Sequence, residues 1–156
     1  MNYEMIAYVL GSLLRIEGIL LTIPTILAFL YGEGPAQKAF LITVVVCLAL
    51  GTLIRHREPE NKSIYGREGF VVVALSWIVM SLFGALPFYL SGAISGFINC
   101  FFETVSGFTT TGASILTEIE GLPMSILFWR SFTHWIGGMG ILVFMLAILS
   151  MGDERS

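Results

Sequence analysis

Four long apolar runs dominate this sequence and limit what it can fold into. They cover roughly residues 5–31, 39–54, 70–90 and 124–151. A helix needs about 20 apolar residues to cross the hydrocarbon core of a bilayer, and the second run reaches that length only with its ends included. The sequence therefore predicts an all-α integral membrane protein, multi-pass and in contact with membrane lipid.

Composition supports the same class. Hydrophobic residues make up 56% of the 156 residues and charged residues 12%, about half the usual share of a soluble domain. So few charges could not cover the surface of a soluble fold. The net charge of −3 offers no basic field, so we expect no nucleic-acid partner. Cys47 and Cys100 form no metal-binding pattern.

Basic residues indicate the orientation of the chain. Residues 91–121 contain no Lys or Arg, and residues 32–38 contain only Lys38. The most basic loop carries Arg55, Arg57, Lys62 and Arg67. Basic loops stay in the cytoplasm. We therefore expect residues 55–68 and both termini to be cytoplasmic, and residues 91–121 to face outward.

A short apolar piece, residues 97–105, lies within that outward stretch. It is too short to span a bilayer as a helix and too apolar for an exposed loop. Residues 106–114 follow and read Ser-Gly-Phe-Thr-Thr-Thr-Gly-Ala-Ser. Consecutive β-branched residues disfavour helix, and glycine permits unusual backbone angles. We expect a re-entrant half-helix followed by an extended polar segment lining water.

That extended segment is a candidate ion filter. Backbone carbonyls can replace the hydration shell of a cation, and the negative end of a half-helix dipole favours a cation nearby. A glycine turns its carbonyl inward without a Cβ in the way. The alternative is an ordinary threonine-rich turn. The candidate filter residues are Thr109, Thr110, Thr111, Gly112 and Ala113, with K⁺ expected at Thr110, Thr111 and Gly112.

Residues 106–114 resemble the first filter loop of the TrkH/KtrB/HKT superfamily of potassium transporters. Three other stretches agree: residues 70–88 resemble the first outer helix of that family's pore repeat, 101–105 its pore helix, and 128–141 its first inner helix. Residues 1–55 resemble the extra N-terminal helix pair of the TrkH branch.

The resemblance implies a domain plan. Two N-terminal transmembrane helices would be followed by one helix–re-entrant pore loop–helix repeat. The expected parts are the helix pair 1–55, a cytoplasmic loop 56–68, and a first pore repeat 69–151 containing an outer helix, a pore helix 97–107, a filter 109–114 and an inner helix 123–151.

The resemblance also implies a function: potassium uptake across the cell membrane as part of a Trk-type transporter. Potassium would be the transported ion, with Na⁺ or H⁺ as a candidate coupled ion and no covalent cofactor. A serine at the filter-glycine position accompanies sodium passage in the HKT branch, so Gly112 favours potassium. The family further implies dimers and a cytoplasmic nucleotide-binding regulatory ring of the TrkA or KtrA type.

This chain holds one repeat, whereas the family's pore has four. Either it is the N-terminal third of a longer protein or it is a single-repeat relative, so further repeats would come from the same chain or from other subunits. The alternative function is a non-conducting truncated subunit that assembles with complete transporters. An enzyme is not expected, because Glu103, His56 and His134 are scattered and form no catalytic set.

Charges and glycines near the candidate filter have two readings each. Glu103 is either an ion ligand or, as we favour, a brace bonded to the filter loop or paired with Arg130. Arg130 is then a filter support, with regulation at the pore mouth as the alternative. The cluster of Gly137, Gly138 and Gly140 on the inner helix serves as a hinge or as a close-packing surface.

Overall fold

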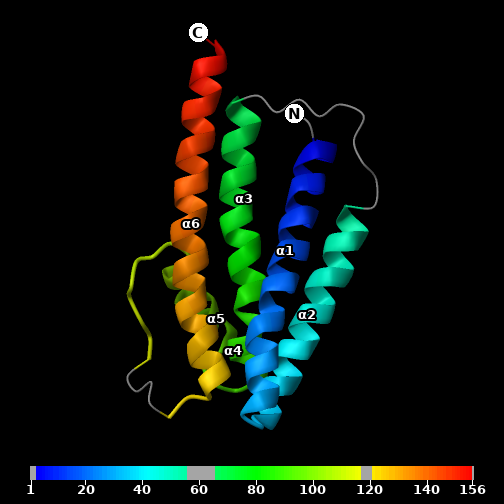
Figure 1. Ribbon diagram of the computed structural model, residues 1–156, viewed down its shortest axis with the longest axis vertical. Coiled ribbons are helices and arrows are strands. Elements are labelled where there is room, and N and C mark those ends of the chain that lie inside the picture. The colour runs from blue at the N-terminus through cyan, green and yellow to red at the C-terminus, as the bar shows by residue number, and fades with distance from the viewer. Residues whose placement is uncertain (1–2, 56–65, 117–120, 156) are drawn as a thin grey trace.

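The computed structural model describes residues 3–55, 66–116 and 121–155, and all regular structure in these ranges is helical (Figure 1). The all-α fold expected from the sequence is confirmed. Most of the expected cytoplasmic loop, including His56, lies outside the described residues. The helices are α1 (Tyr3–Leu30), α2 (Gly34–Ile54), α3 (Gly66–Gly84), α4 (Leu86–Leu90), α5 (Phe97–Phe108) and α6 (Met124–Arg155).

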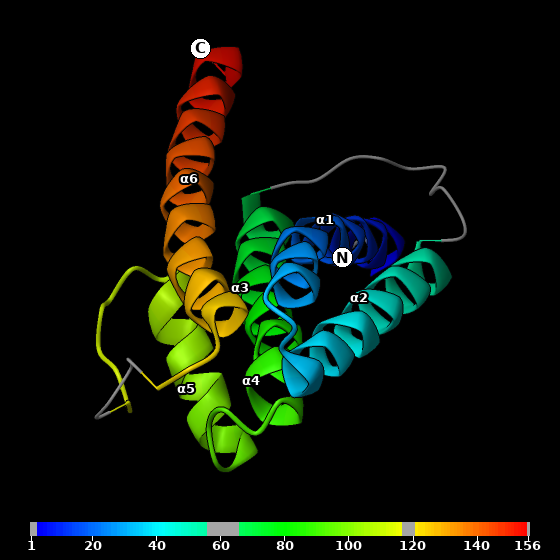
Figure 2. The same cartoon turned by 60° about the horizontal axis from the view of Figure 1, so that its bottom comes forward.

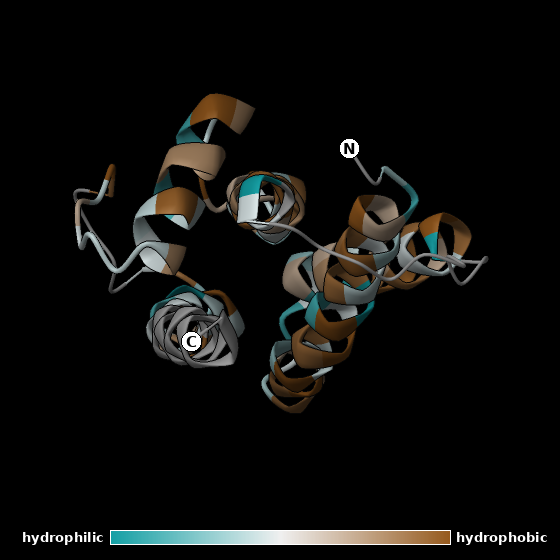
Figure 3. Ribbon diagram, turned by 90° about the horizontal axis from the view of Figure 1, so that it is seen from above, coloured by the Kyte–Doolittle hydropathy of each residue, from teal (hydrophilic) through white to brown (hydrophobic). Residues whose placement is uncertain are grey.

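The long helices alternate in direction. α1 and α3 run one way, and α2 and α6 run the other way (Figure 1). α3 packs against both α1 and α5, and the view along the helices shows it between them (Figure 3). The short helices α4 and α5 lie near the end where α6 begins and where α1 turns into α2 (Figure 2).

Three helical stretches within the described residues are long and apolar enough to cross a membrane: Tyr3–Leu30, Gly34–Ile54 and Gly69–Leu90. Their outward faces expose large apolar side chains, among them Ile19 and Val45, whereas the carboxylate of Glu17 is fully buried. This inverted distribution fits a lipid surround. The protein is a multi-pass membrane protein, and the expected crossing by the 32-residue α6 stays a prediction.

The third apolar run is divided, although the sequence predicts one continuous stretch. α3 ends at Gly84 and α4 begins at Leu86, with Pro87 in its first turn. Proline lacks the N–H that would continue the helix ladder, which frees a carbonyl four residues earlier. Next to that carbonyl, the Gly84 oxygen accepts a hydrogen bond from the buried indole Nε1 of Trp129, at 2.9 Å. The break thereby binds α6 to α3.

Small residues bring α1 and α2 into close contact. A Cβ on Gly51 would lie 2.8 Å from the Gly11 carbonyl oxygen and 2.7 Å from Cγ of Arg15. At the same end, the Arg55 guanidinium donates to the Tyr8 hydroxyl at 2.9 Å and stacks on its ring. In lipid, such close backbone approach supplies much of the free energy of helix association, because apolar side chains gain little over lipid tails.

We therefore expect Gly51→Ala to weaken the α1–α2 pair. The new methyl group meets backbone atoms that cannot move without separating the helices, and overpacking of this kind costs about 1–3 kcal/mol. Thermal unfolding in detergent micelles measures the loss. Gly34→Ala is the matched control, because nothing lies within 4 Å of its added Cβ. Equal melting temperatures for the two variants would contradict this packing.

Candidate ion filter and its supports

In the segment after α5, the sign of the backbone angle φ alternates from one residue to the next. The helix ends at Phe108, and Thr109 keeps a right-handed conformation with φ −82° and ψ 0°. Thr110 and Gly112 have φ of 55° and 81°, while Thr111 between them has no positive φ. Residues 109–115 are all exposed. Alternation of hand turns successive peptide groups to the same side, so their carbonyl oxygens can line one path.

Thr110 has the least favourable backbone conformation in this segment. A β-branched residue with positive φ is a strained conformation, worth roughly 1–3 kcal/mol, that persists only where its surroundings fix it. The fixing bonds come from the end of α5. Thr110 N donates to the Gly107 carbonyl at 3.0 Å, and Thr111 N donates to the Ser106 carbonyl at 2.9 Å. The Ser106 hydroxyl also donates to the Ala113 carbonyl oxygen.

Glu103 joins three parts of the site. It is 4% exposed, and one carboxylate oxygen accepts from Arg130 Nε at 2.7 Å. The Ser114 hydroxyl donates to the same carboxylate at 2.9 Å, and Ile115 N donates to it at 3.0 Å. The structure thus contains both contacts considered for a brace, to the loop and to Arg130. With its oxygens occupied by donors, this carboxylate has little capacity left to bind an ion.

The Arg130 side chain is 22% exposed and its Nε points to Glu103. Its backbone carbonyl is also used within α6. The Thr133 hydroxyl donates to it at 2.6 Å, and Nδ1 of His134 lies 2.9 Å away. This part of α6 is therefore fixed both by its own turn and by the ion pair to α5.

The three glycines of α6 have different surroundings. A Cβ on Gly137 would overlap the carbonyl group of Phe108, the last residue of α5. A Cβ on Gly138 would lie 4.0 Å from the Thr110 methyl group, and one on Gly140 would lie 4.0 Å from the Trp77 ring. Only Gly137 is required by a close approach, which sets the end of α5 directly against α6.

Sequence reasoning missed two supporting residues, Ser106 and Thr133. Ser106 anchors the segment as described, and the Thr133 hydroxyl lies where a Cβ on Gly107 would be. The sequence of α5 contains a signal, because Glu103, Ser106 and Gly107 recur at the spacing that places them on one helix face. Its apolar side chains Ile98 and Phe102 are exposed, while Glu103, Thr104, Ser106 and Gly107 are buried. A short helix that buries its polar face inside a membrane protein must bond that face to protein groups.

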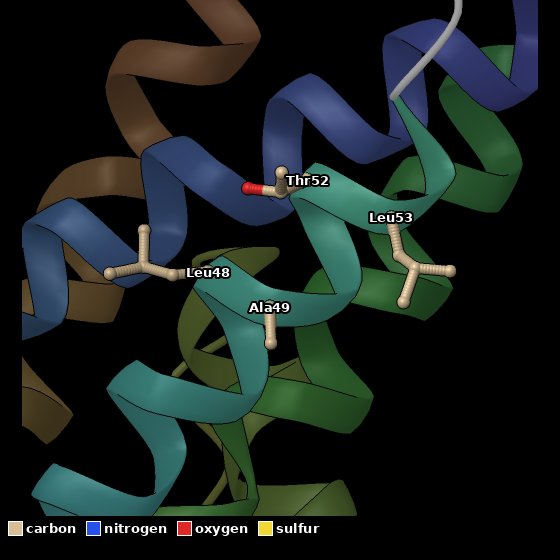
Figure 4. A pocket seen from close by; sticks show the side chains of 4 residues that line it. All are labelled: Leu48, Ala49, Thr52 and Leu53. Carbon is tan, nitrogen blue, oxygen red and sulfur yellow. The ribbon is translucent and has the colours of Figure 1, made fainter.

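The structure also has a surface hollow that lies away from the candidate filter. A hollow of about 660 Å³ lies on α2 and is lined by Leu48, Ala49, Thr52 and Leu53 (Figure 4). Among the side chains that the structure describes, no group of three or more His, Cys, Asp or Glu could hold a metal ion.

Breaking the ion pair should loosen this site. Arg130→Gln leaves the buried Glu103 carboxylate without its cation. Breaking a fully buried pair costs roughly 3–5 kcal/mol, and the partial exposure of Arg130 reduces this to about 2–3 kcal/mol. The free energy of unfolding in detergent measures the change. Arg67→Gln, at an exposed residue near the start of α3, is the control. A loss no larger than that of the control would mean that the pair contributes little.

Gly137 and Gly140 allow a close contact and an ordinary contact to be compared on the same helix. Gly137→Ala should push α5 away from α6, because the added methyl group and the Phe108 carbonyl would occupy the same space. We expect lower stability by about 1–3 kcal/mol and faster proteolysis between residues 109 and 116. Gly140→Ala makes only an ordinary contact with Trp77 and should be tolerated. Similar behaviour of both variants would contradict the contact.

Comparison with known proteins gives consistent results. Residues 36–155 match the TrkH family, described as cation transport proteins. The chain is 41% identical over 154 residues to the Trk system potassium uptake protein TrkH of Escherichia coli K12, and 38% identical to that of Halomonas elongata. In both cases the match covers 96% of this chain and 31% of the relative, so the chain spans about a third of their length.

The fold has a close counterpart among solved structures. The crystal structure of the potassium transporter TrkH from Vibrio parahaemolyticus superposes with a TM-score of 0.90 and 35% identity. The superposition covers 96% of this chain and 32% of that chain. Family match, sequence identity and three-dimensional similarity agree: the chain belongs to the TrkH family of cation transport proteins.

Proposed function

We propose that this chain takes part in potassium uptake across the cell membrane and supplies one strand of carbonyl oxygens to a potassium filter. The observation that carries the proposal is the alternating backbone hand at Thr110 and Gly112 in an exposed segment at the end of α5. Carbonyls turned to one side can replace the water around a dehydrated cation. The relatives named as potassium uptake proteins support potassium as that cation.

The charges around the candidate filter are compatible with the passage of a cation. The C-terminal end of the α5 dipole favours a cation beside Thr109 and Thr110. Glu103 is neutralised by Arg130, so a potassium ion would meet carbonyl and hydroxyl oxygens rather than a carboxylate that binds too tightly to release it. The filter residues of the proposal are Thr109 to Ala113, and potassium passes without covalent chemistry.

One segment provides a quarter of a four-sided cage. The proposal therefore includes further pore repeats, in the same chain or in other subunits. It also includes dimers of the complete transporter, a regulatory ring of the TrkA or KtrA type, and Na⁺ or H⁺ as a candidate coupled ion. The competing function is a non-conducting subunit that assembles with complete transporters.

The proposed topology places both termini and residues 55–68 in the cytoplasm, with α5 re-entrant from outside. The antiparallel order supports it: the start of α1, the end of α2, the start of α3 and the end of α6 lie at one end of the molecule (Figure 1). Arg55 and Arg67 lie at that end, which basic residues mark as cytoplasmic.

Gly112→Ser tests the proposal. Nothing lies within 4 Å of a Cβ at Gly112, but φ of 81° disfavours any side chain, so the backbone must rotate and its carbonyl must turn. We expect the potassium-to-sodium permeability ratio of the conducting assembly to fall about tenfold or more, equivalent to about 1.4 kcal/mol of discrimination. Radiotracer or electrical flux measurements give the ratio.

The control is Thr109→Ala, which removes a hydroxyl bonded to Val105 O and Thr111 Oγ1 without changing the backbone hand. It should matter less. An unchanged permeability ratio in Gly112→Ser would exclude Gly112 from the filter. Absence of any flux through assemblies with the wild-type chain would favour the non-conducting subunit instead.

A further inference from the structure

The turn between α1 and α2 contacts the beginning of α6, far along the chain. Glu33 Oε2 accepts a hydrogen bond from Met124 N at 2.6 Å, and Oε1 accepts one from Ser125 N at 3.1 Å. The contact joins residues 91 positions apart. It connects the N-terminal helix pair to the helix that holds the candidate filter.

Glu33 supplies hydrogen-bond acceptors that the first turn of α6 does not have among its own side chains. The first N–H groups of any helix have no intrahelical partner and carry partial positive charge, so a carboxylate there is stabilising. α6 has no acidic residue in its own first turn, and Pro123 precedes it. Glu33 therefore caps α6 from another element, with both carboxylate oxygens engaged.

Everything that holds the filter segment to α6 lies further along the same helix. Arg130 is six residues after Met124 and Gly137 is thirteen, which places them about 9 Å and 20 Å along the axis at 1.5 Å per residue. Arg130 bonds Glu103, and Gly137 contacts the Phe108 carbonyl. A shift of α6 along its axis would therefore move both supports together.

We propose that Glu33 is a positioning residue for the filter. By capping α6 it fixes the start of that helix and, together with the Trp129–Gly84 hydrogen bond, sets its axial position. Through Arg130 and Gly137 this position determines where the end of α5 and residues 109–114 lie. The α1–α2 pair then contributes to ion selection without contacting the ion. This inference rests on the proposed potassium function.

The test uses Glu33→Ala and Glu33→Gln in the potassium-conducting assembly that contains this chain. Hydrogen exchange at Met124 and Ser125 reports the cap directly, and the potassium-to-sodium permeability ratio reports the filter. In Glu33→Ala we expect exchange at these amides to quicken about tenfold, as for loss of a helix cap, and the ratio to fall several-fold. Glu33→Gln keeps one acceptor oxygen, so both effects should be intermediate.

The matched control is Gln37→Ala. Gln37 lies near the same turn, but its amide donates to the Ala28 carbonyl at 3.1 Å. Its loss should leave the exchange at Met124 and the permeability ratio unchanged.

Each contrary outcome has one meaning. Unchanged exchange in Glu33→Ala would overturn the cap itself. Faster exchange with an unchanged ratio would show that the cap is merely structural and would overturn the positioning role. If the wild-type assembly conducts no potassium, the proposed function fails and the positioning role fails with it, while the exchange data still report on the cap. Should the Ala variant not fold, Glu33→Gln decides the same questions.

Discussion

A carboxylate taken out of water costs several kcal/mol unless hydrogen-bond donors meet it, and Glu103 is met by donors from every part of its neighbourhood. Arg130 comes from α6, and Ser114 and Ile115 come from the segment that follows α5. These donors cannot separate from one another without leaving a buried charge unpaired. α5, the strained backbone at Thr110 and the facing part of α6 are consequently held together, and these contacts maintain the strain.

The sequence predicts the outline of this arrangement because membrane physics leaves few alternatives. Apolar runs long enough to span become α1, α2 and the combined α3–α4 stretch, and the run too short to span becomes α5. An ionised side chain within an apolar segment needs a partner, which is why the sequence alone suggests that Glu103 pairs with Arg130. The flanking glycines and three threonines also mark the irregular backbone. Their assignment to an ion filter stays a prediction.

What could not be predicted depends on how distant segments meet. Pro87 is visible in the third apolar run, yet the resulting break at Ala85 matters because Trp129 bonds the Gly84 carbonyl there. Gly137, Gly138 and Gly140 look alike in sequence, and packing alone makes the first of them indispensable. The same holds for Glu33, since nothing near residue 33 indicates that a helix 91 positions later lacks a cap.

The separation between Glu103 and Arg130 has a consequence for biosynthesis. The cation is 27 residues later in the chain than the carboxylate it neutralises. At ribosomal speeds of about 5–20 residues per second, the delay between the two is roughly 1–5 seconds. During that interval α5 has been synthesised without the cation that pairs with Glu103. α5 can therefore form the Glu103–Arg130 contact only after residue 130 has been synthesised, so the structure of this site depends on a later part of the chain.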